Sequence, residues 1–219
     1  MSIDYKTHWR KSGLKKDWGN IFLNIVNQHK PQVFLEVGVF CGVTARNVCE
    51  LLNIIHSGKF KYIGVDLFGD KVNDDEKAPN YLKKQSFSNP IKNLFYNIIL
   101  RENLNSYDSV QKFLKNFSKN ITLIKGNSNK ILKHLDMQNI DFAFLDGGHS
   151  FETIFNDLNL VFNKISLNKE AIILCDDYED ADYITGVKLA VDQFVKEKKL
   201  KFEVIEKRFA KITDRKSVV

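Results

Sequence analysis

The chain has 219 residues, of which 43% are hydrophobic and 27% charged, a balance typical of one sizeable globular domain. Its formal net charge of +6 comes mostly from lysines spread along the chain, so we interpret it as a solubility feature and disfavour a nucleic-acid partner. The first residues lack the apolar core of a signal peptide, and no apolar run approaches the length of a membrane span. We therefore expect a soluble, cytoplasmic protein with no membrane partner.

The first 30 residues predict an arm followed by a helix. Residues 1–17 are polar, with Trp9 taken as the one large apolar group, and we expect a mobile or ligand-ordered arm there. From Trp18 to Asn27 the apolar side chains recur at helical spacing, which predicts a helix packed against a sheet.

Three cysteines occur at positions that do not suggest a bridge or a metal site. Cys41, Cys49 and Cys175 form no C-x-x-C pair and are odd in number. We expect reduced and mostly buried thiols.

The stretch from Val33 to Leu52 predicts a strand, a glycine loop and a helix. The loop reads E-V-G-V-F-C-G, and from Val43 onward apolar residues recur at helical spacing. Gly38 leaves room for a ligand against the backbone, and Gly42 permits a tight entry into the helix, whose first N–H groups attract an anionic group. This arrangement is typical of nucleotide-binding α/β proteins.

The spacing of the acids around this loop favours a cationic nucleoside ligand. A dinucleotide site would read G-x-G-x-x-G, whereas this chain has E-x-G-x-x-x-G, so an NAD-dependent oxidoreductase is disfavoured. Glu36, at the end of the first strand, suits a ligand with positive charge. The second predicted strand, residues 60–65, ends at Asp66, which can accept hydrogen bonds from ribose hydroxyls.

Residues 68–100 exceed what a plain crossover between strands needs, so they are an insertion. A lid or substrate wall is one interpretation, and a decorative or dimerising segment is the other. Within it, residues 91–100 can form a helix.

The third predicted strand, residues 121–124, runs into G-N-S-N. Ser128 would cap the helix that follows, and a second interpretation has Ser128 and Asn129 bonding an adenine edge. The other elements expected after the insertion are helices over 106–117 and 154–161, strands over 140–145 and 171–174, a helix over 185–196, and an antiparallel hairpin of 202–205 and 209–212.

These elements predict an α/β fold with a mainly parallel, Rossmann-like sheet of seven strands, helices on both faces and an antiparallel C-terminal hairpin. We expect a single domain over residues 1–219, with an N-terminal arm and helix over 1–30, a lid or substrate wall over 68–100 and a flexible tail over 214–219.

Several acids follow predicted strands and therefore meet at one edge of the sheet. Asp146 follows the fourth strand in the run D-G-G-H, and Asp176 and Asp177 follow the fifth in C-D-D-Y. Three neighbouring carboxylates suit a hard cation, so we predict a Mg²⁺ site of Asp146, Asp176 and Asp177. The alternative is that Asp146 caps a helix and the aspartate pair forms a turn.

His149 follows two glycines at the mouth of the same crevice, and a histidine can accept a proton near neutral pH. We predict that it is the catalytic base, acting with Asp146. The alternative is a structural histidine.

The motifs E-V-G-V-F-C-G-V-T, G-N-S-N, F-L-D-G-G-H and C-D-D-Y resemble those of the class I S-adenosylmethionine-dependent methyltransferases, in the order found in the catechol and caffeoyl-CoA O-methyltransferases. D-G-G-H-S-F with D-D-Y is more similar to the bacterial family that includes macrocin-type sugar O-methyltransferases. The resemblance covers residues 33–66 and 121–195 and implies the class I methyltransferase fold.

The resemblance also implies roles for individual residues. Catechol-type enzymes hold magnesium with an aspartate and an Asp-Asn pair, at whose places stand Asp146, Asp176 and Asp177. Their catalytic lysine corresponds in position to His149, which departs from the pattern. The residues predicted to bind the cofactor S-adenosylmethionine are Glu36, Gly38, Phe40, Gly42, Thr44, Asp66, Ser128, Asn129 and Asp146.

We therefore predict an O-methyltransferase whose acceptor is a small molecule such as a sugar or polyol, with Mg²⁺ assisting. Methylation of a small amine or of nucleic acid is one alternative, although the chain lacks the N-P-P-Y-like run of base methyltransferases. A non-catalytic cofactor-binding module is another. The sequence leaves open whether the chain forms a homo-oligomer.

Overall fold

The computed structural model describes residues 4–70, 87–165, 170–179 and 186–213. Its centre is a seven-stranded sheet in the order β3-β2-β1-β4-β5-β7-β6. The first five strands along the chain are parallel, and β7 is antiparallel to both β5 and β6. The strands are β1 (Val33–Val37), β2 (Lys61–Asp66), β3 (Ile121–Lys125), β4 (Phe142–Leu145), β5 (Ile172–Cys175), β6 (Lys201–Ile205) and β7 (Phe209–Thr213).

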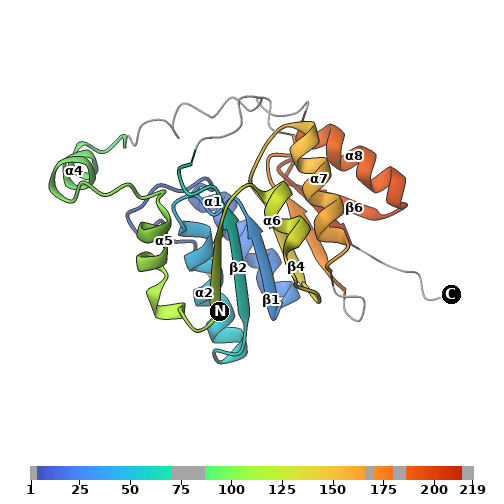
Figure 1. Ribbon diagram of the computed structural model, residues 1–219, viewed down its shortest axis with the longest axis horizontal. Coiled ribbons are helices and arrows are strands. Elements are labelled where there is room, and N and C mark those ends of the chain that lie inside the picture. Colours follow the sequence, from blue (N-terminus) through green and yellow to red (C-terminus); the bar gives the residue numbers. More distant parts are fainter. Residues whose placement is uncertain (1–3, 71–86, 166–169, 180–185, 214–219) are drawn as a thin grey trace.

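Helices cover both faces of this sheet (Figure 1). One buried cluster joins the sheet to α1, α2 and α5, and a second joins it to α6, α7 and α8. The helices are α1 (Lys16–His29), α2 (Val43–His56), α4 (Pro90–Leu94), α5 (Tyr107–Phe113), α6 (Ser128–His134), α7 (Phe151–Phe162) and α8 (Val187–Lys198). The sequence prediction of a mainly parallel, Rossmann-like sheet with an antiparallel C-terminal hairpin is confirmed.

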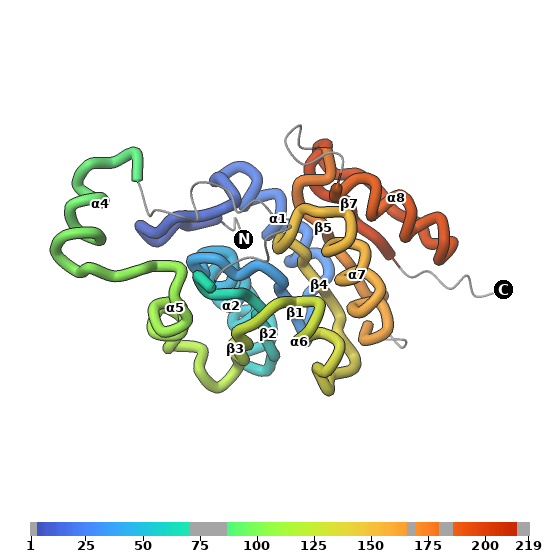
Figure 2. The backbone as a smooth tube through the Cα atoms, turned by 45° about the horizontal axis from the view of Figure 1, so that its top comes forward, coloured from blue at the N-terminus to red at the C-terminus, as the bar shows by residue number. Residues whose placement is uncertain are grey.

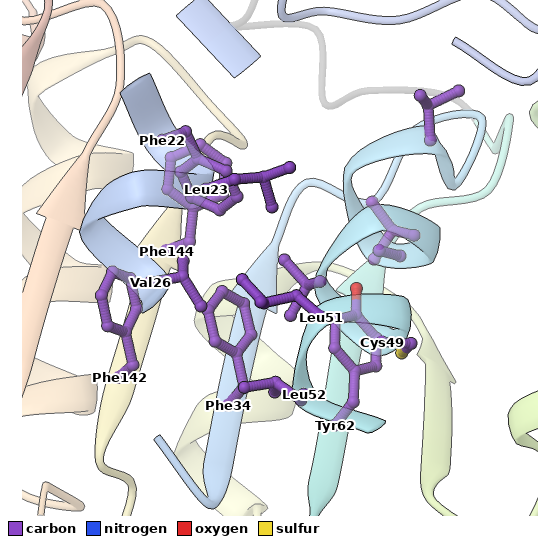
Figure 3. Close-up of a cluster of buried hydrophobic side chains, with 14 of the residues drawn as sticks. Phe22, Leu23, Val26, Phe34, Cys49, Leu51, Leu52, Tyr62, Phe142 and Phe144 are labelled. Atoms are coloured by element: carbon purple, nitrogen blue, oxygen red, sulfur yellow. The ribbon is translucent and has the colours of Figure 1, made fainter. Parts of the chain in front are cut away.

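Alternation along β1 assigns its side chains to the two faces. Phe34 packs on the α1/α2 side, where its ring lies 5.1 Å from that of Phe142 and 5.9 Å from that of Tyr62 (Figure 3). Leu35 belongs to the opposite cluster. By the same alternation Glu36 lies on the α1/α2 side, at the end of the strand where the ligand crevice of such a sheet opens.

The predicted helix over residues 91–100 is a short α4 followed by a π-helical turn, Phe95–Ile99. Asn89 caps α4 by accepting hydrogen bonds from the amides of Ile91 and Lys92, and Pro90 occupies the first turn. Figure 1 shows α4 projecting from the side of the molecule. Most of the rest of the insertion, and the predicted tail over 214–219, lie outside the described residues.

The N-terminal segment differs from the predicted arm, because it is packed against the domain. Tyr5 and Leu14 are buried, whereas Trp9, the residue that the sequence singled out, is 47% exposed. The amide of Lys6 donates to Asn47 of α2, and Asn47 donates back to the carbonyl of Lys6. Figure 2 shows this segment in blue, running between α4 and α1 beside α2.

Two smaller expectations can be compared with the fold. Cys41, Cys49 and Cys175 are buried and free, which confirms the prediction of reduced thiols. In the part of the chain that the structure describes, no helix combines the length and the apolar character that crossing a bilayer requires.

Candidate active site at the carboxyl edge of the sheet

The glycine loop after β1 touches the loop after β4. Gly38 has a φ of 95°, and a Cβ atom there would lie 1.9 Å from the carbonyl oxygen of Asp146. Glycine is therefore required at position 38 because the backbone of Asp146 lies against it. The sequence prediction had instead assigned the space beside Gly38 to a ligand. This contact fixes the position of Asp146 relative to the loop.

Asp66 holds the other side of the same loop. One of its carboxylate oxygens accepts the amide of Phe40 at 2.8 Å, and the other accepts the amide of Phe68. Burial raises the pKa of Asp66, and these amide bonds oppose the rise. Each carboxylate oxygen has a second lone pair, so the predicted ribose contact is compatible with this geometry.

Glu36 lies at the end of β1 and is 1% exposed. Tyr62 of the neighbouring β2 donates its hydroxyl to one carboxylate oxygen, and the other oxygen, Oε1, is buried without a hydrogen-bond partner among the described residues. Burial raises the pKa of Glu36 to about 8. A buried carboxyl group with one unsatisfied oxygen suits a cationic ligand group, which would favour its ionised form.

Helix α2 begins at this loop without a side-chain cap. Gly42 precedes it in the left-handed conformation with a φ of 75°, as the prediction of a tight entry requires. Thr44, in the first turn, pairs through its hydroxyl with that of Tyr5 at 3.0 Å, and Tyr5 also pairs with Ser12 at 2.7 Å. The N-terminal segment thus lies over the start of α2, where an anionic ligand group would bind.

The predicted role of Ser128 as a helix cap is wrong, because Asn127 caps α6 with its side chain. Ser128 begins the helix and donates to Asp157 at 2.9 Å. Asn129 has a buried side-chain oxygen without a hydrogen-bond partner among the described residues. This acceptor is compatible with the predicted contact to an adenine amino group.

Asp146, His149 and Asp177 form a close cluster across the ends of β4 and β5. One potential ligand atom from each lies within 4.8 Å of the other two. Nε2 of His149 is 3.2 Å from a carboxylate oxygen of Asp177. Burial, followed by the charges of Asp176, Asp177 and Glu36, raises the pKa of Asp146 well above its ordinary value.

Asp176 does not join this cluster, because Arg208 binds its carboxylate with two hydrogen bonds. Nε and Nη2 of the guanidinium each lie 2.6 Å from one oxygen of Asp176. Burial raises the pKa of Asp176 to about 6, although the Arg208 bonds lower it. The predicted Mg²⁺ set of Asp146, Asp176 and Asp177 therefore does not match the observed arrangement.

The helix-cap interpretation of Asp146 is also wrong, since Ser150 caps α7 by accepting the amide of Thr153. Asp177, in contrast, is in a left-handed turn conformation with a φ of 56°. This geometry agrees with the turn interpretation and also directs the side chain of Asp177 to His149.

Sequence reasoning missed Arg208, Tyr62 and Tyr5 as residues of this site. Each reaches it from another segment: Arg208 from the hairpin turn, Tyr62 from the neighbouring strand, and Tyr5 from the N-terminal segment. The predicted hairpin could have placed a basic turn beside β5, but no sequence signal indicated the direction of its side chain.

A sequence profile for a family described as "Methyltransferase domain" matches residues 35–178 of the chain. An uncharacterized protein of Acanthamoeba polyphaga mimivirus is 38% identical over 72 residues, which are 30% of this chain and 32% of that protein. The chain thus spans about a third of the length of this relative.

Solved methyltransferase structures have the same fold at low sequence identity. The O-methyltransferase NovP superposes with a TM-score of 0.65 at 17% identity, covering 90% of this chain and 80% of its own. The Podospora anserina methyltransferase PaMTH1 gives 0.59 at 15% identity, with 94% and 83% covered. CalS11, a TDP-rhamnose 3'-O-methyltransferase, gives 0.56 at 13% identity, with 89% and 78% covered.

Proposed function

Because the chain belongs to the family of methyltransferase domains, we propose that it transfers a methyl group from S-adenosylmethionine to a hydroxyl of a small molecule, with a sugar or polyol as the leading acceptor. The observation that carries this proposal is the contact between Gly38 and Asp146, which sets the glycine loop beside the His149–Asp177 pair. NovP is an O-methyltransferase and CalS11 methylates TDP-rhamnose, which supports a hydroxyl acceptor.

The residues around the glycine loop after β1 fit the proposed cofactor. The unsatisfied oxygen of Glu36 suits its cationic groups, and the uncapped start of α2 suits its carboxylate. Asp66 would accept the ribose hydroxyls, and Asn129 would accept from the adenine amino group. When bound, S-adenosylmethionine would supply an electrophilic methyl group on a sulfonium, whose sulfur would keep the electrons of the broken sulfur–carbon bond and leave as the neutral thioether of S-adenosylhomocysteine.

His149 would then remove the proton from the acceptor hydroxyl. The imidazole, which contacts Asp177 through Nε2, would take the proton as the hydroxyl oxygen attacks the methyl carbon. Asp177 would hold the ring in its orientation. Positioning of this kind, which aligns oxygen, methyl carbon and sulfur, is a major part of the catalysis of a displacement reaction.

Mg²⁺ does not fit the three aspartates as they are arranged, because the positive guanidinium of Arg208 lies against both oxygens of Asp176, and Asp176 is not in the group of ligand atoms that Asp146, His149 and Asp177 bring together. The remaining cluster mixes two carboxylates with an imidazole, a donor set that suits transition metals better than magnesium. The proposed reaction is therefore written without a step through Mg²⁺.

The experiment that tests this function is a transfer assay with methyl-labelled S-adenosylmethionine and a panel of acceptors: nucleotide sugars, free polyols, catechols and small amines. We expect label on an oxygen of a hydroxylated acceptor, located by mass spectrometry. Label on amines alone would establish the N-methyltransferase alternative. Cofactor binding without transfer to any acceptor would favour a non-catalytic module.

A further inference from the structure

Arg208 lies in the turn that joins β6 to β7 and reaches the end of β5. Besides its two bonds to Asp176, its Nη2 lies 3.0 Å from the second carboxylate oxygen of Asp177. The side chain of Asp176 is 2% exposed and that of Arg208 is 19% exposed, so these bonds are largely shielded from water. A planar guanidinium that binds one carboxylate with two bonds is among the stronger ionic contacts in proteins.

The turn and two aromatic rings fix the guanidinium in place. The carbonyl of Arg208 accepts the amide of Tyr178, so the turn is bonded to the segment that follows the aspartate pair. The guanidinium carbon lies 5.6 Å from the ring centre of Trp18 in α1 and 5.9 Å from that of Phe209. Contacts from three separate elements therefore hold this cation.

Arg208 faces all three aspartates that the sequence had assigned to a metal. Burial lowers the pKa of Arg208, but the bonds to Asp176 and the charges of Asp176, Asp177 and Asp146 together raise it above its ordinary value. The guanidinium thus supplies positive charge at the place where a divalent cation would otherwise be needed to offset carboxylate repulsion.

We propose that Arg208 is a positioning residue that takes the place of a divalent cation at this edge of the sheet, neutralising Asp176 and holding Asp177 against His149. Its catalytic consequence rests on the proposed function, whereas its effect on cation binding does not. Nη2 binds one oxygen of Asp177, and His149 binds the other, so Arg208 acts on the histidine through this carboxylate.

This arrangement has a clear energetic consequence for metal binding. For Asp176 to ligate a cation, its carboxylate would have to turn away from Arg208 or hold the cation beside the guanidinium, and turning away would leave a partly buried guanidinium without its main partner. Breaking one side of such an ion pair is strongly unfavourable, because it leaves a poorly solvated charge without its partner. The wild-type protein should therefore bind divalent cations weakly.

The test is a Mn²⁺ titration followed by electron paramagnetic resonance, on the wild-type protein and on Arg208→Met, Arg208→Lys and Lys211→Met. Lys211 is a matched control, because it lies on the same hairpin and pairs with Glu203. We expect weak binding to wild type, at least about tenfold tighter binding to Arg208→Met because its carboxylates lose their counter-charge, and wild-type behaviour in Arg208→Lys and Lys211→Met.

Tight, stoichiometric Mn²⁺ binding to the wild-type protein would overturn the proposal, whether Asp176→Asn or Asp177→Asn abolishes it, and this result needs no variant of Arg208. A folded Arg208→Met protein with unchanged Mn²⁺ affinity would also overturn it. Neither readout depends on turnover. Failure of the proposed function would instead appear as a lack of S-adenosylmethionine binding, measured separately on the same preparations.

Discussion

At the carboxyl edge of the sheet, the acids at the ends of β1 and β2 have different bonding partners from the acids that follow β5. At the ends of β1 and β2, which we propose to bind the cofactor and call the cofactor half, Glu36 accepts a neutral tyrosine hydroxyl and Asp66 accepts backbone amides, so no positive side chain is bonded to either among the described residues. At the ends of β4 and β5, which we propose to bind the acceptor and call the acceptor half, Arg208 binds both Asp176 and Asp177. The first half thus suits a ligand that brings its own positive charge, whereas in the second half the protein supplies that charge itself.

The largest effect should come from the acceptor half. His149→Ala should reduce turnover about 10²–10⁴-fold, because it removes the group that we propose accepts the substrate proton, and it should leave cofactor affinity nearly unchanged. Steady-state kinetics and calorimetry with S-adenosylhomocysteine measure the two quantities. His134→Ala, which changes an exposed histidine, is the control. Near-normal turnover of the His149 variant would return this residue to a structural role.

A substitution at the contact between the two halves should lower the stability of the protein. Gly38→Ala adds a Cβ atom 1.9 Å from the carbonyl of Asp146 at a residue with positive φ, so we expect unfolding to become easier by about 3–5 kcal/mol through strain and overpacking. Gly58 also has a positive φ, but the nearest atom to an added Cβ there lies 3.7 Å away, an ordinary van der Waals distance. Gly58→Ala should therefore cost about 1–2 kcal/mol in urea denaturation. Equal losses would show that the contact with Asp146 is unimportant.

In the cofactor half, Asp66→Ala should weaken S-adenosylhomocysteine binding by about 1.5–3 kcal/mol, the worth of hydrogen bonds to a charged group. The variant also loses the anchor of the Phe40 amide, which adds to the effect. Asp70→Ala is the control, because Asp70 is an exposed neighbour paired with Lys125. Unchanged calorimetric affinity in Asp66→Ala would remove Asp66 from the cofactor site.

The smallest effect concerns the ionisation of Glu36. Burial raises its pKa from 4.5 to about 8, so between these values the unfolded chain has lost a proton that the folded chain retains. Stability should therefore fall as the pH rises through this window, by up to about 1.4 kcal/mol per pH unit from this group. Urea denaturation at pH 5.5 and 7 should show a flatter dependence for Glu36→Gln than for wild type. Identical slopes would contradict the raised pKa.

The same comparison shows what the sequence could and could not predict. The strand–glycine loop–helix of residues 33–52 and the acids at strand ends follow from local patterns, and the fold confirms the predicted order of elements. The caps were less predictable, since neighbouring polar residues compete for the same amides, and Asn127 rather than Ser128 caps α6.

The hydrogen-bond partners of the acids could not be predicted from the sequence because they come from distant segments of the chain. Arg208 lies 32 residues after Asp176, and Tyr5 lies 39 residues before Thr44. No local spacing links such residues, since only the packing of the hairpin beside β5, and of the N-terminal segment beside α2, brings them together. The prediction of a polar N-terminal arm treated Trp9 as the one large apolar residue of this segment. The residues that are buried are instead Tyr5 and Leu14.

The most direct test of the account is equilibrium dialysis of labelled S-adenosylmethionine against the protein in excess chelator. We expect one saturable site per chain, competed by S-adenosylhomocysteine, weakened in Asp66→Ala and retained in His149→Ala. Binding that is absent from the wild-type protein, or that requires an added divalent cation, would contradict the division of the sheet edge into a cofactor half and a metal-free acceptor half.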